Sequence, residues 1–215
     1  MNGFKPVDID AWGRRKAFEF FQPFEDPFFN VTVTLGVTAL FELAKKLDLP
    51  FSAAILYFSQ KAANSVREFR IRNVDGRLVE FERVDCTQTI LQDNESFSFS
   101  YVDWSEGLRD FCDRAKVSFA RYKELDTFDV ESERLDLIYY SVLPWLAFTS
   151  FKHASRNNPL ATVPRIVFGK FTKSADGVSM PVSVEVNHMI ADGIHVGKYI
   201  ERFQSFLDDC ESEIS

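Results

Sequence analysis

The chain has 215 residues, of which 46% are hydrophobic and 27% charged, a composition that favours one compact domain and argues against disorder. Its net charge of −7 argues against the basic face of a protein that binds a nucleic-acid backbone. No apolar run is long enough to span a bilayer, residues 1–18 lack a secretion signal, and the three cysteines are far apart. We therefore expect a single domain over residues 1–215, in the cytoplasm, without membrane, nucleic-acid or metal partners.

Periodic patterns divide the first half of the chain into strands and helices. The expected strands are 30–36, 77–85 and 87–91, and the expected helices are 40–47 and 51–69. The dipeptide Asp75-Gly76 is a turn signal, and we expect the two strands that follow it to pair with each other.

The second half continues in the same way. The expected strands are 97–101, 137–142, 145–151, 165–171 and 180–188, and the expected helices are 105–125 and 196–207. Asp176-Gly177 predicts a hairpin turn between the last two strands. This mixture of hairpins and helices predicts an α/β (α+β) fold of two layers, with a mixed sheet flanked by helices.

The stretch NHMIADG at residues 187–193 carries the most chemical information. It places His188 at the end of a strand, where a rigid element can hold an imidazole whose ordinary pKa of about 6.5 suits a general base. Asp192-Gly193 then fits a sharp change of direction. Taken alone the pattern is weak evidence of catalysis, because a histidine before a turn is more often structural than catalytic.

Other segments change this interpretation. The chain resembles the chloramphenicol acetyltransferase family in several segments that occur in the family's order: VDIDAWGRRKAFEFF at 7–21, EFR at 68–70, PWLAFTSF at 144–151, MPVSVEV at 180–186 and NHMIADGIHVG at 187–197. The resemblance implies a mixed sheet flanked by helices. It also implies a homotrimer whose active sites lie between subunits, and transfer of an acetyl group from acetyl-CoA to a hydroxyl of a small molecule.

The resemblance also implies roles for single residues. His188 matches the family's general base, and Ser150 matches the serine that hydrogen-bonds the oxyanion of the tetrahedral intermediate. Asp192 and Arg14 match an ion pair that fixes the loop holding the imidazole. His195 is expected to pack or bond within the first helical turn.

Two further residues match positions near the cofactor. Lys170 aligns with a lysine that approaches the CoA phosphates, although a surface lysine is the default interpretation. Phe171 stands where the family has a tyrosine, and Ser150 is the third residue of the expected acetyl-CoA site.

Departures from the family pattern limit what the resemblance implies. Asn187 replaces the first histidine of the family's doublet, Val167 replaces a threonine that holds a water, and residues 152–163 differ from the segment beside the acceptor pocket. Chloramphenicol is therefore one candidate acceptor among hydroxylated small molecules. The alternatives are a dihydrolipoamide acyltransferase or condensation domain, and a catalytically silent relative that binds CoA or a hydrophobic ligand.

Overall fold

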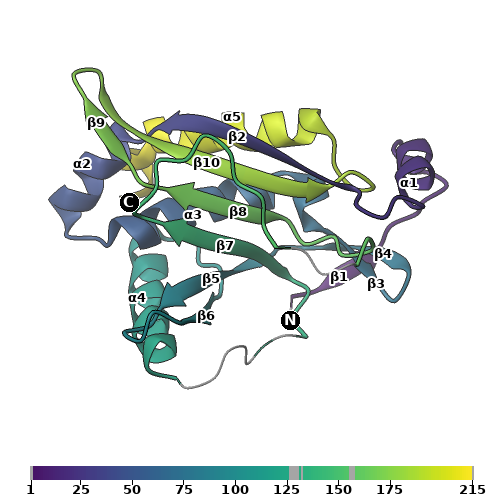
Figure 1. Cartoon of the computed structure of the whole chain (residues 1–215), viewed down its shortest axis with the longest axis horizontal. Helices are drawn as coiled ribbons and strands as arrows, with labels where there is room; N and C mark the ends of the chain where they lie inside the picture. The colour runs from purple at the N-terminus through teal and green to yellow at the C-terminus, as the bar shows by residue number, and fades with distance from the viewer. Residues whose placement is uncertain (1, 126–130, 132, 155–157, 215) are drawn as a thin grey trace.

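A mixed sheet forms the centre of the molecule. Its strands are β2 (Phe28–Gly36), β5 (Asp85–Leu91), β6 (Phe97–Val102), β7 (Leu137–Leu143), β8 (Arg165–Gly169), β9 (Thr172–Ser174) and β10 (Gly177–Asn187). The computed structural model describes residues 2–125, 131, 133–154 and 158–214, and within them the order is β2-β10-β8-β7-β5-β6, with β9 paired to β10 (Figure 1). β7 runs parallel to β5 and β8, whereas the other pairs are antiparallel.

β10 is the longest strand of this sheet and is paired along both edges. Its residues Val182, Val184 and Val186 are buried on one face, and Ser183 and Glu185 alternate with them on the other. Ser183 lies opposite Thr32 of β2 and Val167 of β8. This two-residue alternation is the reason the segment forms a strand with one face on the core.

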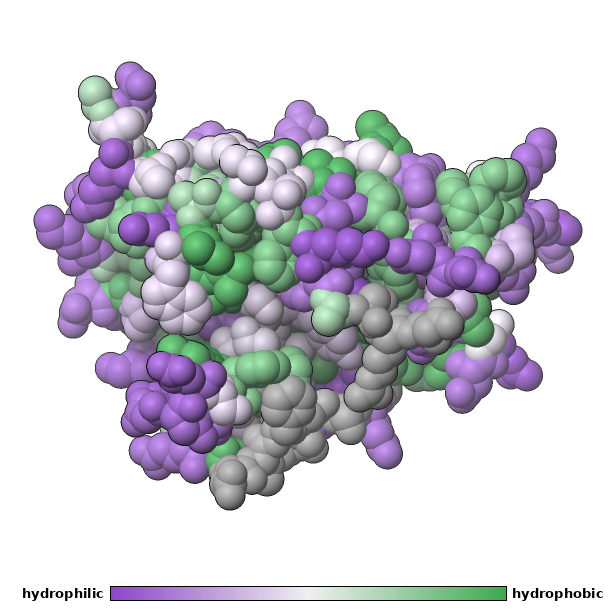
Figure 2. Space-filling model, in the orientation of Figure 1, coloured by the Kyte–Doolittle hydropathy of each residue, from purple (hydrophilic) through white to green (hydrophobic). Residues whose placement is uncertain are grey.

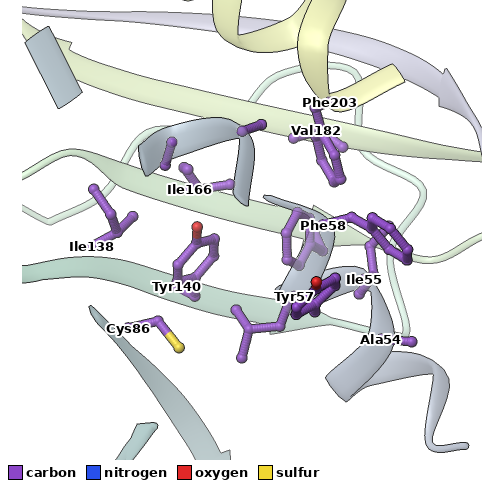
Figure 3. Packing of buried hydrophobic residues seen from close by; sticks show 14 of the residues in the cluster. Ala54, Ile55, Tyr57, Phe58, Cys86, Ile138, Tyr140, Ile166, Val182 and Phe203 are labelled. Atoms are coloured by element: carbon purple, nitrogen blue, oxygen red, sulfur yellow. The ribbon is translucent and has the colours of Figure 1, made fainter. Parts of the chain in front are cut away.

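Helices cover the apolar face of the sheet. They are α2 (Thr38–Leu47), α3 (Phe51–Ser65), α4 (Leu108–Glu124) and α5 (Gly193–Asp208). Phe58 of α3 and Phe203 of α5 pack in one cluster with Tyr140 and Val182 of the sheet (Figure 3). The predicted two-layer arrangement of a mixed sheet and helices is confirmed. Across the part of the chain that the structure describes, no helix is both long and apolar enough to cross a membrane.

The opposite, more polar face of the sheet is crossed by residues 144–154 and 158–164, here together called the 144–164 segment (Figure 1). The hydroxyl of Ser183 lies within hydrogen-bond distance of Oδ1 of Asn30 in β2, at 2.9 Å, and of the carbonyl of Phe151, at 3.4 Å, so Phe151 lies directly against β10. The predicted strand at 145–151 is wrong, because the chain leaves the sheet after β7 and these residues run over its face in irregular conformation.

A second, smaller sheet lies beside the first. It consists of β1 (Phe4–Pro6), β4 (Arg77–Phe81) and β3 (Ile71–Val74), with β4 in the middle. The predicted pairing of the strands at 77–85 and 87–91 is therefore wrong. The turn at Asp75-Gly76 instead joins β3 to β4, and both of its residues have positive φ (49° and 81°), as this tight turn requires.

Gly169, the last residue of β8, shows how closely the 144–164 segment lies on the sheet. A Cβ at this position would stand 2.6 Å from Cγ of Pro181 and 2.8 Å from the carbonyl oxygen of Leu146. A methyl group here would therefore force the segment away from the strand.

We expect Gly169→Ala to lower the free energy of unfolding by about 1–3 kcal/mol, the usual cost of overpacking. Gly197→Ala is the matched control, because Gly197 lies in α5 and a Cβ added there would meet no atom within 4 Å. That change should be neutral or stabilise the chain by up to about 1 kcal/mol. Urea unfolding of both variants measures the difference, and equal stabilities would show that the segment is not closely packed on Gly169.

Candidate active site

His188 follows directly on β10 and is fixed by its own backbone. Its N–H donates to the carbonyl of Pro27 at 2.8 Å, and its carbonyl accepts a hydrogen bond from Nη2 of Arg14 at 3.0 Å. The side chain is 32% exposed. The ring is therefore held by main-chain bonds at the end of a strand while part of it still faces solvent.

Two phenylalanines hold the imidazole ring. Phe21 ends α1 (Arg15–Phe21) and stacks on His188 with ring centroids 4.1 Å apart and planes 9° apart. Phe29 of β2 lies against the ring at 4.5 Å, tilted by 40°. Sequence reasoning did not identify either residue as part of the site. The only signal was the density of phenylalanines between residues 18 and 29, which does not show which of them reaches the histidine.

The two ring nitrogens of His188 have different surroundings. Nδ1 is buried and lies 2.8 Å from Oδ1 of Asp192, although without the alignment of a hydrogen bond. A carboxylate at this distance favours the tautomer that carries its proton on Nδ1. Nε2 then keeps its lone pair and is the nitrogen available to a substrate.

Arg14 holds the Asp192 carboxylate with both arms of its guanidinium. Nη2 lies 3.0 Å from Oδ1, and Nη1 bonds Oδ2. This hydrogen bonding by Arg14 is the main reason that the pKa of Asp192 is lowered, so the carboxylate is ionised at neutral pH. Arg14 precedes α1 and Asp192 precedes α5, so the pair ties the N-terminal helix to the turn after His188.

His195 supports the same turn from within α5. Its Nδ1 accepts a hydrogen bond from the backbone N–H of Asp192 at 2.9 Å, and its Nε2 lies 3.4 Å from Oε1 of Glu68. The expected bond within the first helical turn is present. Gly193 differs from expectation, because it has no positive φ and simply begins the helix.

Ser150 lies apart from His188 within one chain. It is an exposed residue of the 144–164 segment, next to Phe151, whose carbonyl contacts Ser183. Ser183 precedes His188 by five residues, which is about 16 Å along a strand. Among the contacts of the described residues, none joins Ser150 to His188. The predicted catalytic role of Ser150 thus stays a prediction.

Lys170 and Phe171 lie at the other end of β10. Phe168 pairs with Val182, so Lys170 lies beside the part of β10 that precedes His188 by eight residues, about 26 Å along the strand. In Figure 1 the β9 hairpin and α1 are correspondingly at opposite ends of the sheet. One chain therefore brings together His188, Asp192 and Arg14, but does not bring the other predicted residues to them.

Three further observations concern the site and its surroundings. Val167 is fully buried, and its apolar side chain offers no polar group at the position where the resemblance leads us to expect a threonine. In the ranges that the structure describes, no group of three or more histidine, cysteine or acidic side chains is placed to hold a metal ion. A hollow of 570 Å³ between β6 and α4 includes none of the predicted site residues in its lining.

Solved structures with the same architecture define the class of protein. A chloramphenicol acetyltransferase superimposes with a TM-score of 0.89 at 25% identity, over 95% of this chain and all of the other. The dihydrolipoamide acetyltransferase of Azotobacter vinelandii shares the fold, with a TM-score of 0.67 at 11% identity over the whole of both chains. The fold is that of a chloramphenicol acetyltransferase, which places the chain in the class of acyltransferases.

Sequence comparisons narrow the class to a family. The family model for chloramphenicol acetyltransferase matches residues 1–204, and the chain belongs to that family. A chloramphenicol acetyltransferase of Escherichia coli is 30% identical over 210 residues, which cover 97% of this chain and 96% of the relative. A Klebsiella chloramphenicol acetyltransferase is 30% identical over 212 residues, with the same coverage.

The burial of His195 predicts a pH dependence of stability. Burial lowers the pKa of His195, so the unfolded chain, where a histidine titrates at about 6.5, takes up the proton more readily than the folded chain. The contribution of this residue is complete above about pH 6.5 and is lost as the pH falls below that value. Burial lowers the pKa of His153 as well, which adds a loss of the same sign.

We expect the free energy of unfolding to fall between pH 7.5 and pH 5.5, and to fall less in His195→Asn, which keeps an acceptor but does not titrate. Urea unfolding at the two pH values measures both losses. The lowered pKa of Asp192 acts only below about pH 4, outside this window. An equal loss in the variant and the parent chain would refute the role of His195.

Proposed function

We propose that this chain is an O-acetyltransferase that transfers the acetyl group of acetyl-CoA to a hydroxyl of a small molecule, with His188 as the general base. The observation that carries the proposal is the asymmetric setting of the imidazole. Its Nδ1 is buried beside the Asp192 carboxylate, and its ring lies between Phe21 and Phe29. This arrangement leaves Nε2 free to accept a proton.

The reaction follows from that setting. Nε2 of His188 takes the proton of the acceptor hydroxyl while the oxygen attacks the thioester carbonyl and forms the new C–O bond. The C–S bond then breaks, and the thiolate of CoA receives the proton back from the imidazolium. The carboxylate of Asp192, 2.8 Å from Nδ1, stabilises the positive charge that the ring carries between these two steps.

Ser150 is the proposed donor to the oxyanion. Its hydroxyl is exposed on the 144–164 segment, so it can meet a substrate that approaches the outer face of the sheet. A single preorganised donor of this kind contributes about 10²–10³ in rate. Because Ser150 and His188 are well separated within one chain, the proposal requires that they come from different copies.

A homotrimer with sites between subunits, as in the family, satisfies this requirement. The polar face of the sheet supplies Ser150 in one copy, and the α1 end of β10 supplies His188 in the next. Closed rings of identical subunits bring two different surface patches together at each interface, which a single chain cannot do.

The opposite end of β10 has features that fit the nucleotide end of acetyl-CoA. Lys170 is exposed, and Phe171 packs against Phe41 and Phe51 at 5.3 and 5.7 Å. Lys173 adds a second cation, 4.3 Å from the centre of the Phe41 ring. A lysine pair beside an aromatic surface suits phosphates and a purine ring.

Aromatic side chains beside His188 indicate the character of the acceptor. Phe20 and Phe24 are 63% and 41% exposed and pack with Phe21, and Figure 2 shows apolar side chains gathered over α1. Such a surface fits an acceptor with an apolar or aromatic body next to its hydroxyl. Chloramphenicol, which appears in the names of the relatives, is one such acceptor.

The three buried free cysteines are compatible with the reducing cytoplasm expected for this enzyme.

The first test is release of free thiol from acetyl-CoA with a panel of hydroxylated acceptors that includes chloramphenicol. We expect acceptor-dependent release that falls by about 10²-fold or more in His188→Ala, the usual contribution of a general base. Thermal unfolding and CoA binding of the variant serve as controls for its fold. If the parent chain and His188→Ala show equal release with every acceptor while CoA still binds, the chain is a silent binding member of the family.

The second test asks whether the Ser150 and the His188 of one active site come from different copies of the chain. His188→Ala and Ser150→Ala are unfolded together, refolded as a mixture and assayed. If each site combines two copies, about a quarter of the interfaces join an intact His188 to an intact Ser150, and activity returns well above that of either variant alone. A mixture no more active than its components would place both residues in one chain's own site, and sedimentation as an active monomer would have the same meaning.

A further inference from the structure

Asn187, the last residue of β10, is only 2% exposed, and both polar atoms of its side chain are hydrogen-bonded. Nδ2 donates to the carbonyl of Pro159 at 2.8 Å and to that of Ala161 at 2.9 Å. Oδ1 accepts a hydrogen bond from the backbone N–H of Met189 at 2.9 Å. All three bonds are made to main-chain groups, so they fix backbone positions and not merely rotamers.

These bonds connect two parts of the proposed catalytic machinery. Pro159 and Ala161 belong to the 158–164 part of the 144–164 segment and follow Ser150 by nine and eleven residues, and Met189 begins the turn that follows His188. The main chain of Asn187 takes part as well, because its carbonyl accepts hydrogen bonds from the N–H groups of Ile190 and Ala191, both at 3.0 Å. The Ser150 segment is thereby tied to the strand end that holds the general base.

The chemistry of the side chain explains why asparagine stands here. A carboxamide offers two N–H donors on one nitrogen and an oxygen acceptor, so it can bond two carbonyls and one N–H at once. A neutral imidazole offers one donor and one acceptor and cannot make all three bonds. A carboxylate offers no donor and would face two carbonyl oxygens.

We propose that Asn187 is a positioning residue that sets the 144–164 segment, and with it Ser150, for transfer of the acetyl group. The inference rests on the proposed function, since it assumes that Ser150 acts on the oxyanion. Charge on that oxygen develops only in the transition state, so a displaced Ser150 lowers kcat by a larger factor than it raises the KM for acetyl-CoA.

The test compares Asn187→Asp with a matched control in the full-length chain. Asn64 makes the same kind of contact away from the site, with Nδ2 on the carbonyl of Val84 at 3.0 Å and Oδ1 on its N–H at 2.8 Å. We expect both changes to lower the temperature of unfolding. Asn187→Asp should also lower kcat by about 10-fold or more, approaching the ~10²-fold that a 1 Å displacement costs, whereas Asn64→Asp should keep kcat within about twofold.

A double-variant cycle shows whether the effect passes through Ser150. If it does, adding Asn187→Asp to Ser150→Ala should lower kcat by no more than about twofold further, because the misplaced group is already absent. Asn187→His, which keeps one donor and one acceptor, should give an intermediate kcat. It also serves as the test variant should Asn187→Asp fail to fold.

Two results would overturn the proposal. One is a kcat for the Asn187 variants no lower than that of Asn64→Asp, and the other is the same loss of kcat with and without Ser150. Failure of the proposed function itself looks different, because His188→Ala would then retain the activity of the parent chain whatever the Asn187 variants do.

Discussion

The pairing of β10 along both of its edges is the constraint on which the site depends. The strand is bonded to β2 over the whole stretch from Ser179 to Asn187, and to β8 over part of it. A slip of one residue would move every valine of the strand from the core to the outer face. The burial of those valines therefore fixes the register, and the register fixes the point at which His188 leaves the sheet.

Residues far apart in the sequence then complete the setting of the histidine. Arg14 comes from the N-terminal part of the chain and bonds both the carbonyl of His188 and the carboxylate of Asp192. Phe21 follows from the adjoining helix and stacks on the ring. The imidazole is thus oriented by contacts with its backbone, its ring face and its Nδ1, which leave only Nε2 for chemistry.

The two faces of the sheet have different tasks. One face packs on α3 and α5 and supplies the core, as the cluster around Phe58 and Phe203 shows (Figure 3). The other carries polar residues and the 144–164 segment, which lies so close that Gly169 has no room for a Cβ. Asn187 stands where the second face meets the turn after His188, so a single side chain connects the segment to the strand end that carries the proposed base.

Local sequence patterns were sufficient to predict the strands and helices that bury one face against the core along their whole length. The alternation in β10 and the helical spacing in α2, α4 and α5 are of this kind, and the motif around His188 indicated the candidate site because the strand end and the helix start adjoin it directly. The stretch at 145–151 was misjudged as a strand because its apolar residues, of which Trp145 and Leu146 are more than half exposed, follow the end of β7 and belong to no strand. The strands at 77–85 and 87–91 were wrongly paired because neighbours in sequence can join different sheets.

What the sequence by itself determined was the class of fold, the family and the residues to examine: His188, Asp192, Arg14 and Ser150. Only the tertiary structure decided that Phe21 and Phe29 hold the imidazole, that Asn187 binds the 144–164 segment, and that Ser150 lies away from His188 within one chain. The reason is physical. Periodicity records whether a side chain faces the core or solvent, whereas a ring stack or a hydrogen bond depends on the spatial position of groups that the chain brings together from distant segments.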